Sequence, residues 1–72
     1  MKTFKELPEI LTAQDIATYL GISRRRVYEL FQLHPEHGGI VNFDIGFSKR
    51  VQKEDFYQWM QDQKKKKISN FA

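Results

Sequence analysis

Residues 13–33 read AQDIATYLGISRRRVYELFQL, and this stretch predicts two short helices joined by a tight turn. Thr12 and Ser23 are suited to the two N-caps, because a hydroxyl there can accept a backbone N–H of the first turn. Gly21 follows the first apolar run, where a left-handed residue ends a helix at low cost. The pattern predicts one helix over about residues 13–20 and a second that begins after Ser23.

The apolar residues of these two helices have the spacing of a helix-turn-helix. Ala17 is small enough to let the second helix approach the first, and Ile22 is expected to fill the corner between them. Val27, Leu30 and Phe31 form one apolar stripe that fastens the second helix to the first. A plain helical hairpin with a charged outer face stays open as the alternative, although this spacing is more demanding than a hairpin requires.

The polar face of the second predicted helix has the composition of a DNA reader. At 100° per residue, the apolar stripe points away from Arg25. The helix could therefore enter a major groove with its N-terminal residues nearest the bases. An arginine fork can bond both O6 and N7 of guanine. The candidate contacts on this helix are Ser23, Arg24, Arg25, Tyr28, Glu29 and Gln32.

A β-hairpin is predicted after the second helix, which Pro35 ends near Leu33. Residues 41–45 alternate between apolar and polar, as in a strand with two different faces. Gly46 offers a turn, and residues 48–51 can return as a second strand. The apolar residues that share one face are Val41, Phe43 and Ile45.

A last helix is predicted over about residues 54–63, with Phe56, Trp59 and Met60 as its core-facing stripe. A thin core needs its largest side chains, so we interpret this stripe as core and expect Trp59 to be mostly buried.

The predicted fold class is α+β, mostly α: a small winged helix-turn-helix with a hairpin wing and a C-terminal helix. We divide the chain into a lead-in (1–10), a DNA-binding domain (11–63) and a basic tail (64–72).

Basic residues gather beside the predicted helix start, beside the hairpin turn and at the C-terminus. The net charge is +3, but without the four adjacent lysines eight basic residues face nine acidic ones, a balance of −1. Local basic clusters on a near-neutral body favour an oriented contact with a polyanion, and a solvated basic face is the alternative. We expect phosphate or wing contacts from Arg26, Lys49, Arg50 and Lys53, with an intramolecular pair as the alternative for Arg26. Non-specific attraction is expected from the tail residues Lys64, Lys65, Lys66 and Lys67.

Composition excludes several classes of protein. Seventy-two residues make one small domain with little room for an enclosed active site. The chain has no cysteine, and His34 and His37 lack the partners of a tetrahedral metal site, so we expect no metal and no cofactor. No nucleophile-and-base pattern or glycine-rich phosphate loop is present, so we expect no enzyme. No apolar run approaches a membrane span, and the expected location is the cytoplasm.

The chain resembles the excisionase-type, MerR-like helix-turn-helix family. Residues 20–30, LGISRRRVYEL, carry the resemblance. A glycine turn at residues 45–46, a basic pair within 49–51, and an acidic helix start with a tryptophan within 54–59 follow in the family's order. The resemblance covers about residues 11–60. This resemblance implies a winged DNA-binding domain of the kind encoded by phages, mobile elements and bacterial chromosomes. Members of the family use this domain either in DNA excision or in transcription regulation.

We therefore expect a double-stranded-DNA-binding protein that acts architecturally, as an excisionase-like protein or a small regulator of a phage or mobile element. An integrase or recombinase, or a second copy of the chain, is the further partner that a module of this size would need for specificity. The rival interpretation is a protein-interaction adaptor, in which Tyr28, Phe47 and Trp59 face a partner protein and the basic tail is incidental. No membrane partner is expected.

Overall fold

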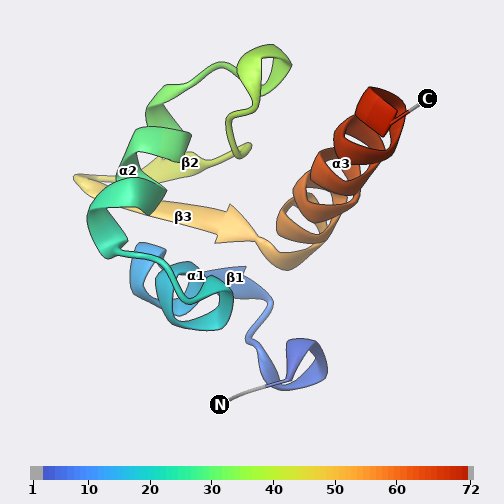
Figure 1. Cartoon of the computed structure of the whole chain (residues 1–72). Coiled ribbons are helices and arrows are strands. Elements are labelled where there is room, and N and C mark those ends of the chain that lie inside the picture. The colour runs from blue at the N-terminus through green and yellow to red at the C-terminus, as the bar shows by residue number, and fades with distance from the viewer. Residues whose placement is uncertain (1–2, 72) are drawn as a thin grey trace.

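The computed structural model describes the backbone of residues 3–71 and the side chains of residues 3–68 (Figure 1). Helices and strands follow in the order predicted for an α+β, mostly α domain, with two additional short elements near the N-terminus. The elements are η1 (Phe4–Glu6), β1 (Ile10–Leu11), α1 (Ala13–Leu20), α2 (Arg24–Gln32), η2 (Pro35–His37), β2 (Phe43–Ile45), β3 (Ser48–Gln52) and α3 (Lys53–Phe71).

The helix-turn-helix is built from the local signals that the sequence contains. Thr12 Oγ1 accepts the N–H of Asp15 at 3.1 Å, and the Thr12 N–H donates to the Asp15 carboxylate at 3.0 Å. This is a complete capping box with Asp in place of the usual Glu. Gly21 is left-handed, with φ +72°, and its N–H donates to the carbonyl of Ala17. Ser23 Oγ then accepts the N–H of Arg26 and begins α2.

The sheet has three antiparallel strands in the order β1-β3-β2. The hairpin β2–β3 was predicted, but β1 was not, because two residues are too few for an alternation pattern. β1 places Leu11 opposite Val51, and both side chains are fully buried. Leu7 is also buried, and Phe4 stacks against Phe56. The N-terminal segment therefore contributes Leu7 and Leu11 to the core.

The two faces of the sheet differ in burial. The register of β2 and β3 pairs Phe43 with Arg50 and Ile45 with Ser48, so these residues lie on the face opposite Val51. The predicted alternation of β2 is present, but its apolar side is the exposed one, and Ile45 is 60% exposed. Val51 on one face belongs to the buried core, whereas Phe43 and Ile45 on the other face are exposed.

The core joins all parts of the chain. Its buried apolar residues are Leu7, Leu11, Ala13, Ile16, Ala17, Val27, Phe31, Ile40, Val51 and Phe56. Ile22 is exposed, so the expectation that it fills the corner between α1 and α2 is wrong. Ile40 was not predicted, yet it is fully buried and its N–H donates to the Leu30 carbonyl. Gly39 permits this return, because a Cβ there would overlap the Leu33 carbonyl group.

α3 is longer than predicted. It runs from Lys53 to Phe71, so the lysine run continues a helix and does not form a separate tail. Lysine has a high helix propensity, and Pro and Gly are absent from residues 54–71, so no local signal ends the helix at residue 63. Phe56 is fully buried, whereas Trp59 is only half-buried and donates its indole N–H to the Gly38 carbonyl at 2.9 Å. No helix among the described residues is long and apolar enough to cross a membrane.

Candidate nucleic-acid interface

α2 is fixed to the core by one face and presents the other to solvent. Val27 and Phe31 are buried on the inner side. Every candidate contact predicted on this helix is exposed, with Arg25 opposite the buried residues and Arg24 and Tyr28 on the flank of the helix. These residues are Ser23, Arg24, Arg25, Arg26, Tyr28, Glu29 and Gln32.

The three arginines of α2 differ in their local partners. Arg24 and Arg25 make no hydrogen bond or ion pair with the residues that the structure describes. Arg26 lies 3.9 Å from the Glu29 carboxylate, one helical turn away, and both side chains are exposed. An exposed pair of this kind contributes little to stability and separates readily. Arg24 and Arg25 are therefore the guanidinium groups most available to an external anion.

Ser23 and Tyr28 have roles inside the domain as well as an exposed surface. The Ser23 hydroxyl oxygen accepts the Arg26 N–H, and it retains a proton that it can donate elsewhere. The Tyr28 ring packs edge-on against Phe31 with the ring centroids 5.9 Å apart. This contact holds the aromatic ring in place beside the arginines.

The hairpin carries a basic pair that is partly engaged. Lys49 Nζ donates to the Asp44 carboxylate across the strands at 2.9 Å, and Arg50 donates a guanidinium N–H to the Lys49 carbonyl. Figure 1 shows the hairpin turn on the left of the molecule, the side on which α2 also lies. On β3, Lys49, which is shared with a carboxylate, lies on the Val51 face of the sheet, and Arg50 lies on the opposite face.

Lys53 is not part of this surface. Its ammonium donates to the Leu7 carbonyl at 3.0 Å and to the Lys5 carbonyl at 3.4 Å. It also lies over the Phe4 ring, 4.9 Å from the centroid. These contacts hold the N-terminal segment against the start of α3 and engage the ammonium group that was predicted to contact phosphate.

The lysine run lies far from α2. Lys64, Lys65, Lys66 and Lys67 are all exposed on α3. Four consecutive helical residues point in four directions around the axis, so they do not form one basic face. Figure 1 shows α3 on the right of the molecule and α2 on the left. α3 therefore carries these lysines on the other side of the molecule from α2 in this view.

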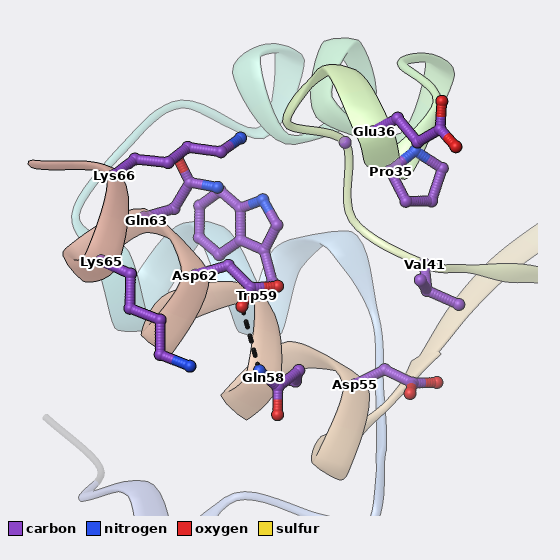
Figure 2. Close-up of a pocket in the computed structure, with 11 residues that line it drawn as sticks. Pro35, Glu36, Val41, Asp55, Gln58, Trp59, Asp62, Gln63, Lys65 and Lys66 are labelled. Carbon is purple, nitrogen blue, oxygen red and sulfur yellow. Dashed lines mark hydrogen bonds between the residues drawn. The ribbon is translucent and has the colours of Figure 1, made fainter. Parts of the chain in front are cut away.

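A cleft of about 340 Å³ lies between α3 and the η2 segment. Figure 2 shows the Trp59 ring at its centre. Its charged lining residues are Glu36, Asp55, Asp62, Lys65 and Lys66. Gln58 donates to Asp62 along α3. Carboxylates on both sides of the cleft disfavour a phosphate backbone there, and within the described residues no group of three His, Cys, Asp or Glu side chains could hold a metal ion.

Comparison of the chain with protein-family models, with curated proteins and with solved structures finds no match in any of the three.

The structure also identifies one candidate functional residue that the sequence did not assign to DNA binding. Phe47, which the sequence suggested only as part of a protein-binding surface, lies at the hairpin turn with its side chain wholly exposed. The available sequence signal was a large apolar residue directly after the turn glycine, where no core contact is possible.

Proposed function

We propose that this chain binds double-stranded DNA in a sequence-dependent way, with α2 in the major groove and the β2–β3 hairpin on the adjacent backbone. The observation that carries the proposal is the pair Arg24 and Arg25. Both are exposed and unpaired within the described residues, at the N-terminal end of a helix whose opposite face is buried. Guanidinium groups on a fixed helix can meet guanine edges with little loss of conformational freedom.

The hairpin supports a positioning role. Lys49 and Arg50 lie on the β2–β3 hairpin, whose turn is on the same side of the molecule as α2 in Figure 1, and phosphate contacts from such a site would fix the register of the helix in the groove. The Asp44 carboxylate lowers the local positive charge near Lys49, so we expect Arg50 to be the stronger phosphate contact. Neither residue is expected to read sequence.

The size of the module indicates how it would act. α2 has nine residues and spans about 13 Å, enough for only a few base pairs. Useful specificity would need a second copy, adjacent sites or a partner protein. We therefore propose an architectural role without catalysis, as in an excisionase-like protein or a small regulator of a phage or mobile element, with an integrase or recombinase as a candidate partner.

Selection of binding sites from random duplexes, followed by titration, tests this proposal. Wild-type protein should enrich one short motif and bind it more tightly than a scrambled duplex, with an affinity that falls steeply as salt rises. Lys5→Ala is the control, because it removes one exposed positive charge from η1, outside α2 and the hairpin. This variant should keep the preference for the selected duplex over the scrambled one. Failure to enrich any motif, with equal affinity for both duplexes, would contradict the proposal.

A protein-binding adaptor remains the second candidate, and the exposed side chains of the hairpin favour it. Ile45 and Phe47 are exposed apolar residues on one short element, and such residues are typical of interfaces. Trp59 no longer belongs to that surface, because its ring is half-buried and its N–H is bonded to Gly38. Binding to protein through these side chains would depend weakly on salt, which separates the two candidates.

A further inference from the structure

The turn of the hairpin contains an aromatic residue that the fold does not need. The β2–β3 connection is the two-residue turn Gly46-Phe47, and Gly46 supplies the only positive φ in it, +62°. A turn of this kind demands glycine at its first position and accepts most residues at its second. A polar residue at position 47 would therefore build the same hairpin.

Phe47 is the most exposed large apolar side chain among the described residues. Its relative exposure is 109%, and it makes no ring contact with the other described aromatic residues. A wholly exposed phenyl ring contributes no burial to folding and leaves its apolar area in water. Its placement therefore points to a surface outside the chain.

The surroundings of Phe47 indicate the chemistry of that surface. Lys49 and Arg50 follow it within three residues on β3, and the turn lies on the side of the molecule that α2 occupies (Figure 1). An apolar tip flanked by cations suits a surface whose edge is anionic and whose interior is apolar and flat. Stacked bases between phosphate backbones have this arrangement, whereas an apolar protein patch offers no anion to Arg50, the cation of the two that has no carboxylate partner among the described residues.

We propose that Phe47 is a wedge that enters between two adjacent base pairs from the minor groove and bends the duplex beside the site of α2. This inference rests on the proposed function and adds a DNA deformation to it. Side chains of this class partly unstack a base step and kink the duplex toward the major groove. The site then depends on how easily that step unstacks, which selects sequence at base pairs that α2 does not touch.

The test uses the selected duplex with 2-aminopurine placed in turn at each step flanking the α2 contact, and with a fluorophore pair at its ends. Wild-type protein should raise 2-aminopurine emission at one step and shorten the end-to-end distance. Phe47→Ser should lose both signals and bind about 5- to 150-fold more weakly, the range expected for one base–aromatic stack. Phe47→Leu keeps an apolar wedge and should retain the bend.

Ile45→Ala is the matched control, because Ile45 is also an exposed apolar residue of the hairpin but lies one position before the turn. It should leave the emission and the bend unchanged. A single mismatch at the responsive step lowers the free energy needed to unstack it. The mismatch should therefore tighten DNA binding by the wild type but not by Phe47→Ser. Thermal unfolding followed by circular dichroism should give all three variants the wild-type Tm, because the side chains of Ile45 and Phe47 are both exposed.

Three results would overturn the wedge. The first is unchanged emission and bend in Phe47→Ser with the sequence preference intact, which leaves the proposed function standing. The second is a wild-type dimer in sedimentation without DNA that Phe47→Ser dissociates, which assigns the residue to a contact between copies. The third is the absence of any sequence preference in the wild type, which removes the proposed function and the wedge together.

Discussion

At the scale of single residues, Arg25 is the side chain on which the proposed reading of DNA depends most. It is exposed, unpaired within the described residues and opposite the Val27 and Phe31 side of α2. Arg25→Ala should therefore leave the Tm unchanged and cost ~1–3 kcal/mol of binding on the preferred site. The loss on a scrambled duplex should be much smaller, and fluorescence anisotropy on both duplexes measures the difference. Equal losses on both would show that Arg25 contacts phosphate and not a base.

Phe56 and Trp59 lie on the same helix and stabilise the domain in different ways. Phe56 is fully buried, so Phe56→Ala should cost ~3–5 kcal/mol and could unfold so small a domain. Trp59 is half-buried, and Trp59→Phe mainly removes the hydrogen bond to Gly38, so it should cost ~0.5–1.5 kcal/mol. Urea unfolding of both variants checks this order. A larger loss in Trp59→Phe than in Phe56→Ala would contradict the placement of the core.

At the scale of elements, the hairpin should act on affinity without acting on sequence preference. The double variant Lys49→Ala, Arg50→Ala removes two cations from β3, and binding should weaken by a similar factor on the preferred and the scrambled duplex. Asp44→Asn is the matched control, because it removes the carboxylate that Lys49 shares and should leave binding equal or tighter. Unchanged affinity in the double variant would exclude the hairpin from the interface.

The basic end of α3 should matter less for binding than four charges alone suggest. Deletion of residues 64–72 removes four lysines and no groove-reading residue, so affinity should fall on every duplex. The slope of log K against log salt should shrink by clearly less than about four units, because α3 carries these lysines on the other side of the molecule from α2 in Figure 1. A truncated protein that loses its sequence preference would contradict the assignment of reading to α2.

At the scale of the whole molecule, the N-terminal segment is required for the fold. β1 supplies the buried Leu11 and pairs with β3. The Lys53 ammonium donates to the carbonyls of Lys5 and Leu7, which precede β1. Deletion of residues 1–11 should abolish the cooperative thermal transition, because a domain of this size has little stability to lose. The deletion of residues 64–72 is the comparison, since it removes no described core residue and should retain the transition. A cooperative transition after the N-terminal deletion would contradict this account of the core.

Local signals in the sequence were sufficient to predict several elements of the fold. Thr12, Gly21 and Ser23 set the ends of α1 and α2 through caps and a left-handed turn, and these interactions span four residues or fewer. Gly46 likewise set the hairpin turn. The exposed arginines of α2 followed from helical periodicity, because Val27 and Phe31 define which side is buried.

Only the tertiary structure decided the features that depend on residues distant in the chain. β1 exists because Val51 offers it a partner forty residues later. The apolar side of β2 is exposed because the buried core lies on the other face of the sheet, which alternation alone cannot indicate. The Lys53 ammonium binds the Leu7 carbonyl, and the Phe47 side chain is wholly exposed, for the same physical reason: the partners of a side chain depend on the assembled chain and not on its neighbours in sequence.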